Sequence, residues 1–405
     1  TTSLWLAGRC QRSLADMELG NRRRARRERR TIARTWCVPA SRSDESTVLR
    51  RPEATSDQAV AFCPERKEAK MPRPLLAQLV HVELLTPDYD ASRRFFTEIV
   101  GLSVVHETDS RAYLRCWGDH YTYSVVLTAA AYPGLGHAAW RAWSPEDLEQ
   151  AVRNIEASGV RGEWIEGDFG HGRAYRFRAP GGHSIEILWE IERYNAPPEL
   201  ASTFPERPQK FRGGGLEPRH LDHVTVATSD VLRDVYWFRD NLGFRFMCYN
   251  GLEDDPDFVV FAMVTTNEKD HDLAFVKDMS PIPGRLNHVS FYVDTREALF
   301  RAADLLLEAG YAIEFGPGVH GMGEQSYLYF REPSGIRLEL NSGGTRNYVP
   351  DWEPVRWRPS QGSNIFFRNT PMPDSMLECF PPATHPAFAA DLGLVADTQQ
   401  PNPYR

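Results

Sequence analysis

Two halves of the chain repeat each other, and this duplication limits the possible folds more than any other feature of the sequence. Three pairs of segments align without gaps: residues 79–105 with 221–247, 134–160 with 285–311, and 179–190 with 332–343. Self-similarity on this scale indicates repeated supersecondary units that bury their apolar faces against one another. The sequence therefore predicts two related domains.

Each half has the same internal pattern. A strand that carries a histidine is followed by a turn, by an amphipathic helix that ends at Gly101 or Gly243, and by further strands. We therefore predict the α+β class, with two tandem domains of paired βαβββ modules over residues 71–200 and 216–345. The stretch 196–215 is rich in Pro and Gly and is predicted to link the halves.

The two ends of the chain lack this pattern. Residues 1–70 show no sustained helical or strand periodicity and contain the run NRRRARRERR, so we predict a disordered basic extension with no part in the chemistry. Met71 is a candidate for the natural start. Residues 346–405 combine aromatic residues with many prolines, which favours an extended arm or lid over the second half.

Composition excludes several classes of protein. The 405 residues are 41% hydrophobic, and no apolar run approaches the roughly 18 residues that a membrane span needs. The net charge is −8; residues 1–70 carry 16 Lys and Arg against 9 Asp and Glu, so the rest carries −15, which argues against nucleic-acid binding by the folded part. Six cysteines without C-x-x-C spacing indicate neither a disulfide framework nor a zinc knuckle, and the cytoplasm is expected.

Three residues of the second half are candidate metal ligands. His223, His288 and Glu339 each lie in the middle of an apolar strand. A buried carboxylate is costly unless a cation holds it, whereas a single histidine at such a position is more often a hydrogen-bonded core residue. Together, two imidazoles and one carboxylate form the facial triad of a non-haem iron site, which leaves positions open for a bidentate substrate and dioxygen.

The segment around Glu339 resembles the signature of a known family. Its fixed positions are Gly318, His320, Leu328, Tyr329, Glu332, Pro333, Gly335 and Glu339. This spacing is similar to that of type I extradiol ring-cleavage dioxygenases, the catechol 2,3-dioxygenase family of the vicinal oxygen chelate superfamily. The resemblance covers residues 71 to about 370 and implies a glyoxalase-like fold.

The resemblance also implies roles for individual residues. His223, His288 and Glu339 would bind Fe(II), with Mn(II) as the alternative. His271 would lie beside dioxygen as an acid and base, and we expect its pKa to stay close to the unperturbed value of roughly 6.5. His320 and Tyr329 would contact the two hydroxyl oxygens of the substrate.

The implied reaction is extradiol cleavage of a monocyclic catechol by dioxygen, giving a 2-hydroxymuconic semialdehyde-type product in aromatic degradation. The implied assembly is a homotetramer in the cytoplasm. Phe315 lies five residues before His320 where a basic residue would mark a carboxylate-bearing ring, which favours an apolar or halogenated catechol. The alternatives are a metal-dependent isomerase or 2-oxo-acid dioxygenase of the same superfamily, and a non-catalytic ligand-binding protein of the same fold.

The first half retains a similar set of residues. His81, His137 and Glu186 align with the candidate ligands of the second half, but Arg176 aligns with Tyr329. We interpret this half as structural. The alternative, a second metal that supports no ring cleavage, stays open from the sequence.

Overall fold

The computed structural model describes residues 74–361 and 372–391. The chain divides into two units after Arg66, and all of these residues belong to the second unit, Lys67–Arg405. The predictions for residues 1–70, including the basic extension, lie outside the described residues. Among the helices that are described, none is long and apolar enough to cross a membrane.

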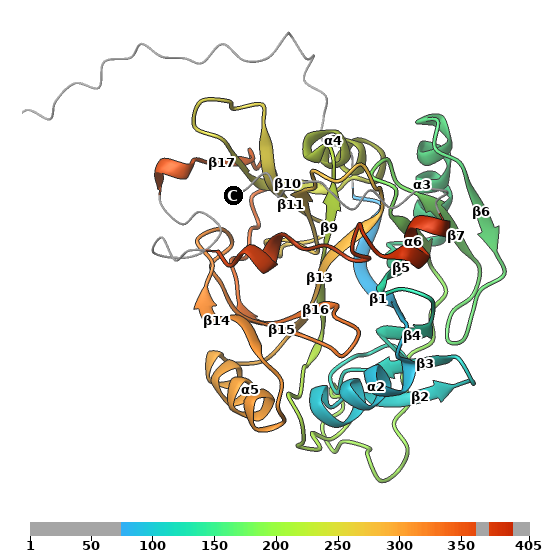
Figure 1. Cartoon of the computed structure of the whole chain (residues 1–405). Coiled ribbons are helices and arrows are strands. Elements are labelled where there is room, and N and C mark those ends of the chain that lie inside the picture. The colour runs from blue at the N-terminus through green and yellow to red at the C-terminus, as the bar shows by residue number, and fades with distance from the viewer. Residues whose placement is uncertain (1–73, 362–371, 392–405) are drawn as a thin grey trace, which may run out of the picture. The chain divides into compact units, whose positions relative to one another are not determined.

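Four successive βαβββ modules and a C-terminal arm make up the described chain (Figure 1). The first half contains β1 (Leu76–Thr86), α2 (Tyr89–Arg94) with its π-helical continuation η2 (Phe95–Val100), β2 (Ser103–Glu107), β3 (Arg111–Arg115), β4 (Val125–Ala129), β5 (Gly134–Ala142), α3 (Pro145–Ala157), β6 (Gly162–Ile165), β7 (Ala174–Arg178) and β8 (Ser184–Leu188). The second half contains β9 (His220–Thr228), α4 (Val231–Leu242), β10 (Arg245–Gly251), β11 (Val259–Thr265), β12 (Leu273–Lys277), β13 (Arg285–Tyr292), α5 (Arg296–Glu308), β14 (Ile313–Val319), β15 (Gln325–Arg331) and β16 (Arg337–Gly343). The C-terminal arm, residues 346–361 and 372–391, contains β17 (Val355–Trp357), η3 (Pro359–Gln361), η5 (Asp374–Leu377) and α6 (Pro386–Asp391). The predicted α+β class and order of modules are confirmed.

Each half forms one mixed sheet, and the two sheets have the same connectivity. The first has the order β2-β3-β4-β1-β5-β8-β7-β6, and the second β14-β15-β16-β13-β9-β12-β11-β10-β17. In both, the first strands of the two modules pair antiparallel at the centre, β1 with β5 and β9 with β13. The last strand of each module then pairs parallel with the first strand of the same module. This arrangement places the histidine-bearing strands side by side in the middle of each sheet.

Helix α4 shows why the sequence folds in this way locally. The carboxylate of Asp230 caps its start by accepting a hydrogen bond from the backbone N–H of Arg233. Its end is at Gly243, whose φ of +79° is left-handed and suits glycine. Val235 and Phe238 face the sheet and are buried. Gly101 ends the equivalent helix of the first half with a φ of +88°, so both predicted helix ends are confirmed.

The two halves share one hydrophobic core. Phe95 of η2 packs against Tyr311 and Phe330 of the second half, with ring centroids 4.7 and 6.2 Å apart. Beside this contact, the hydroxyl of Ser92 donates a 2.6 Å hydrogen bond to the carboxylate of Glu332. The first half is therefore fixed against the turn that precedes β16, the strand that carries Glu339.

The C-terminal arm is attached to the second sheet. Strand β17 pairs parallel with β10, and the indole N–H of Trp352 donates to the carbonyl of Met247 at 2.9 Å. The arm also contacts β16, in the other half of the same sheet, where the buried guanidinium of Arg337 donates to the carbonyls of Ser375 and Glu378. These hydrogen bonds connect the arm directly to β16.

A buried ion pair holds Arg337 in place. Glu314 accepts two hydrogen bonds from Arg337, at 2.9 and 3.0 Å, and two from Arg331, at 3.2 and 2.7 Å. Burial alone would raise the pKa of Glu314, but the two guanidiniums lower it to about 2. The carboxylate is therefore ionised whenever the protein is folded near neutral pH.

We predict that the stability due to Glu314 is lost in acid. Its folded-state pKa is depressed, so the contribution is present above its ordinary pKa of 4.5 and disappears as the pH falls from there to about 2. The difference in urea midpoint between the wild type and Glu314→Gln should be largest above pH 4.5 and should shrink at lower pH. The exposed Glu308→Gln is the control, and a difference that does not vary with pH would contradict the prediction.

Candidate metal centre

Three side chains of the second sheet converge at one point. In the pairing of β9, β13 and β16, Ser290 lies opposite both His223 and Glu339. The Nε2 atoms of His223 and His288 are 3.2 Å apart, and they lie 3.1 and 3.3 Å from Oε2 of Glu339. Atoms that coordinate one metal at about 2 Å lie roughly 3 Å from each other. The three predicted ligands are therefore brought together in a geometry that fits a common ion.

A β-bulge aims His288 at this point. The pairing with β9 shifts between Leu286 and His288, so that Asn287 is an additional residue on β13. The side-chain oxygen of Asn287 pairs with Nδ1 of His288 at 2.8 Å, and its carbonyl accepts a 3.0 Å hydrogen bond from Arg337. The Nδ1–H of His288 is thereby engaged, which leaves the lone pair of Nε2 for a metal.

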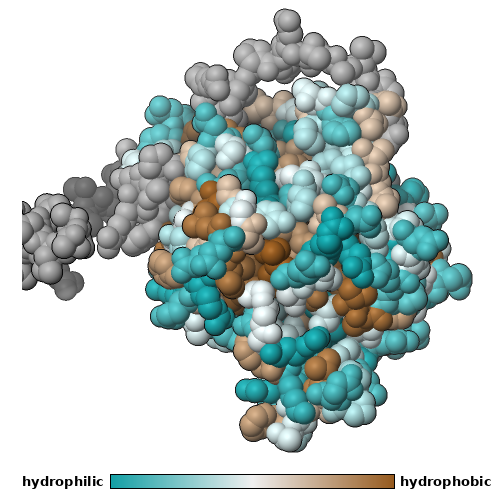
Figure 2. Space-filling view, turned by 60° about the horizontal axis from the view of Figure 1, so that its bottom comes forward, coloured by the Kyte–Doolittle hydropathy of each residue, from teal (hydrophilic) through white to brown (hydrophobic). Residues whose placement is uncertain are grey.

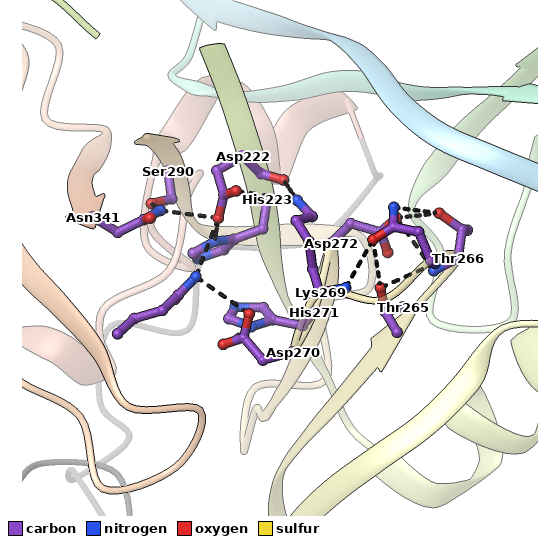
Figure 3. Close-up of polar contacts among 12 residues, drawn as sticks. Asp222, His223, Thr265, Thr266, Lys269, Asp270, His271, Asp272, Ser290 and Asn341 are labelled. Atoms are coloured by element: carbon purple, nitrogen blue, oxygen red, sulfur yellow. Dashed lines mark hydrogen bonds and ion pairs between the residues drawn. The ribbon is translucent and has the colours of Figure 1, made fainter. Parts of the chain in front are cut away.

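Asp222 orients the imidazole of His223 through its Nδ1 atom, as Asn287 does for His288. Its Oδ2 lies 2.9 Å from Nδ1 of His223, and the ammonium of Lys269 lies 3.1 Å from its Oδ1 (Figure 3). Asn341 and Gln325 donate further hydrogen bonds to Oδ2, at 3.0 and 3.3 Å. The carboxylate is therefore fixed from several sides, and it fixes the orientation of the imidazole.

Glu339 indicates most directly that a cation belongs here. Its side chain is 0% exposed, and within the described residues neither oxygen has a hydrogen bond in acceptable geometry, although three imidazole nitrogens lie at 3.1–3.5 Å. Burial would raise the pKa of Glu339, but the imidazoles of His223, His288 and His320 hold it well below its ordinary value. An ionised, buried carboxylate without a hydrogen bond fits a metal ligand.

The two imidazoles have opposite pKa shifts. Burial would lower the pKa of His223, but Asp222 and Glu339 raise it to about 9. Burial lowers the pKa of His288 to about 4, against the opposing effect of Glu339. The two carboxylates beside His223 thus favour positive charge at the place where a metal ion would bring it. This donor set suits a divalent ion of the iron or manganese type.

Two more of the predicted residues lie beside the candidate ligands. Nε2 of His320, just after β14, is 3.5 Å from Oε1 of Glu339 and 3.0 Å from the hydroxyl of Tyr329. Tyr329 lies opposite Glu339 in the pairing of β15 with β16. Burial, followed by the charge of Glu339, raises the pKa of Tyr329 well above its ordinary value, so its hydroxyl keeps its proton.

His271 lies on the other side of His223. It precedes β12 by two residues, its ring centroid is 4.0 Å from that of His223, and its Nδ1 is 3.2 Å from Oδ2 of Asp270. Burial, and then the charge of His223, lowers the pKa of His271 below 6.5. The expectation of an unperturbed pKa is therefore wrong, because this side chain is buried.

A cavity of about 200 Å³ opens onto the triad. Besides the polar groups, its wall includes Phe261 and Met263 of β11, Met322 after His320, and Met376 of the C-terminal arm. None of these residues, nor Asp222, Asn287 or Asp270, was identified from the sequence. The sequence did contain a signal for Asp222, Asn287 and Asp270, because each of these polar residues directly precedes a histidine of the second half. In the first half the residues before His81 and His137 are Val80 and Gly136, which cannot orient an imidazole through a side-chain hydrogen bond.

Comparison with known proteins assigns the fold to a family. The model of the Glyoxalase/Bleomycin resistance protein/Dioxygenase superfamily matches residues 78–187 and 220–340. The chain belongs to this superfamily. The two matched segments correspond to the two sheets, and the resemblance inferred from the motif around Glu339 is confirmed.

Two relatives are equally similar to this chain in sequence. A metapyrocatechase of Geobacillus stearothermophilus is 36% identical over 305 residues, which is 74% of this chain and 92% of the relative. A manganese-dependent 2,3-dihydroxybiphenyl 1,2-dioxygenase of Geobacillus genomosp. 3 is 36% identical over 288 residues, 70% of this chain and 90% of the relative.

A solved structure has the same fold. Homoprotocatechuate 2,3-dioxygenase of Brevibacterium fuscum, in its anaerobic complex with 3,4-dihydroxyphenylacetate, aligns with a TM-score of 0.67 at 25% identity. The alignment covers 77% of this chain and 94% of that enzyme.

We predict that Asp222 determines how tightly the triad binds a metal. In Asp222→Asn the imidazole of His223 loses its charged partner, and such outer contacts typically contribute roughly 10- to 100-fold in metal affinity. Mn²⁺ affinity, measured by competition with a chelator, should fall by that amount. Asp304→Asn on the exposed side of α5 should leave it unchanged. Equal affinities of Asp222→Asn and the wild type would contradict this role.

Proposed function

We propose that the chain catalyses extradiol cleavage of a monocyclic catechol by dioxygen at an Fe(II) site, with Mn(II) as the alternative metal. The observation that carries the proposal is the buried Glu339 carboxylate, which has no hydrogen bond from the described residues and lines a cavity together with two imidazoles. His223, His288 and Glu339 would hold the ion. His271, His320 and Tyr329 surround the space in front of them, and their roles rest on this placement.

The metal would supply Lewis-acid chemistry and a common binding point for the two reactants. When bound, a divalent ion lowers the pKa of the substrate hydroxyls and holds diol and dioxygen at neighbouring positions. The chain's own residues position the substrate and handle its protons. The overall reaction breaks the ring bond next to the diol and leaves both oxygen atoms of dioxygen in the product.

His320 and Tyr329 would position the diol. Their side chains contact each other at 3.0 Å, so a ligand in front of Glu339 meets both. Tyr329 keeps its proton because burial raises its pKa, and it therefore donates a hydrogen bond to a substrate oxygen. His320 can accept the proton that a hydroxyl group releases on binding.

His271 would act on the dioxygen side. Because its pKa is lowered, it is neutral before substrate binds. With Nδ1–H directed at Asp270, its Nε2 is a free acceptor, which can take a proton from the substrate and return it to the reduced oxygen later. The lowered pKa thus favours a base that becomes an acid during turnover.

The cavity favours an apolar ring. Methionine side chains adapt to ligands of different shape, and Met263, Met322 and Met376 contribute to the wall. Lys277 also reaches the wall, but its ammonium already donates a 2.6 Å hydrogen bond to the carbonyl of Ser229. We therefore infer unsubstituted, alkylated or halogenated catechols as substrates rather than catechols with a carboxylate.

The proposed assembly is a homotetramer in the cytoplasm. On α5, Phe300 and Leu307 are 63% and 59% exposed, which is unusual for large apolar side chains unless another molecule covers them. Figure 2 turns the side of Figure 1 on which α5 lies toward the reader, and hydrophobic patches alternate there with hydrophilic residues. These features support contact with further copies of the chain.

A direct assay tests the proposed reaction. Protein loaded anaerobically with Fe²⁺ and then given catechol and air should form a yellow ring-opened product and consume one dioxygen for each catechol. Glu339→Gln should form no product because the third ligand loses its charge. Absence of product from the wild type with Fe²⁺ and with Mn²⁺ would refute the proposal.

Substitution of His271 tests the proton-transfer role. General acid–base groups contribute roughly 100- to 10,000-fold in rate, so His271→Gln should lower kcat by a factor in that range while KM for catechol changes little. Tyr329→Phe should mainly raise KM, because it removes one hydrogen bond to the substrate. The exposed Glu308→Gln is the control, and a wild-type kcat for His271→Gln would exclude the role.

A further inference from the structure

The first half of the chain contains a second convergent triad. His81 on β1, His137 on β5 and Glu186 on β8 occupy the same places in the first sheet as the candidate ligands in the second, with Ala139 opposite both His81 and Glu186. The Nε2 atoms of His81 and His137 are 2.9 Å apart, and they lie 3.7 and 4.0 Å from the oxygens of Glu186. All three residues are at most 2% exposed.

Hydrogen bonds direct the lone pairs of two histidines toward Glu186. Nδ1 of His137 lies 2.9 Å from Oε2 of Glu83, and Nδ1 of His171 lies 2.8 Å from the carbonyl of Gly172. A carboxylate or carbonyl oxygen can only accept, so each Nδ1 carries a proton and Nε2 is the ring atom left to bind a metal. Nε2 of His171 lies 3.6 Å from Oε1 of Glu186.

Glu186 has one satisfied oxygen and one unsatisfied oxygen. Arg176 donates two hydrogen bonds to Oε2, at 3.0 and 2.6 Å. Oε1 has no hydrogen bond within the described residues, although it is buried. Nε2 of His171 therefore faces the unsatisfied Oε1, and a cation between them would give both atoms a partner.

The surrounding charges favour a cation as well. Arg111 donates to Asp168 at 2.8 Å and to Glu83 at 3.4 Å, and Arg176 pairs with Glu186. These three carboxylates and two guanidiniums leave one negative charge around the triad. A divalent ion converts this surplus into a single positive charge, spread over several ligands.

Two replacements close this triad to substrate. Tyr123 lies two residues before β4, where His271 precedes β12, and its ring packs on His81 with centroids 5.1 Å apart. Tyr113 and Phe169 pack against Tyr123. Arg176 lies opposite Glu186, where Tyr329 lies opposite Glu339. Tyr123 and Arg176 thus replace His271 and Tyr329, while His171 lies beside Glu186 as His320 lies beside Glu339.

We propose that His81, His137 and Glu186 bind a second divalent transition-metal ion, with His171 as the fourth donor, in a closed site that stabilises the first half and performs no ring cleavage. Three imidazoles and one carboxylate without an open position suit zinc. Binding is weaker than at the other triad, because Nδ1 of His81 has no partner in the described part of the chain whereas His223 has Asp222.

Metal analysis of the full-length protein tests this site independently of catechol turnover. Protein equilibrated with excess Zn²⁺ and freed of unbound metal should contain two ions per chain. The matched variants His81→Gln and His223→Gln should each contain one, and the double variant none. His81→Gln leaves the pair of Arg176 and Glu186 intact, and Glu163→Gln on the exposed neighbouring strand is the control.

Thermal unfolding adds a second readout. Zn²⁺ should raise the Tm of His223→Gln, which keeps only the first-half triad, and should not raise that of the double variant. A single ion in the wild type that His223→Gln abolishes would overturn the proposal. If His81→Gln does not fold, anomalous diffraction from wild-type crystals soaked in Zn²⁺ decides, since a peak beside Glu186 supports the site and an empty map there overturns it.

Discussion

The buried carboxylate of Glu339 is the constraint on which the second half depends. Its strand lies between two others in the sheet and has no solvent-facing side, so the negative charge needs a partner inside the protein. The surrounding residues are arranged around this need. A bulge at Asn287 turns one imidazole inward, Asp222 orients the second, and Arg337 connects the bulge to Glu314 and to the C-terminal arm. Holding these ligands in place costs free energy when no metal is bound, and metal binding offsets that cost.

Much of the fold could be read from the sequence because its signals were local and repeated. Strand alternation, helix caps and the glycines at 101 and 243 occur twice at equivalent positions, which identified the modules and their order. The candidate triad followed from polar residues in apolar strands, and the structure brings it together. The functional roles of these residues stay predictions.

Other features depend on contacts between distant segments, which no local pattern encodes. The cavity wall combines β11, the loop after His320 and the C-terminal arm, and the sequence does not show that Met263 and Met376 meet there. The pKa of His271 was misjudged for the same reason, since the burial that lowers it comes from the packed sheet and not from a local pattern. The bulge at Asn287 also follows from strand pairing and leaves no local signature.

The C-terminal strand β17 has a consequence for the integrity of the second sheet. It pairs with β10 at the end of the strand order, so it covers backbone groups that would otherwise face outward. A chain cut before residue 355 would leave β10, which contains the buried residues Phe246 and Met247, as an unpaired edge strand of the sheet. Unpaired edge strands form hydrogen bonds with strands of other molecules, so truncation at this point would promote aggregation before it affected the reaction.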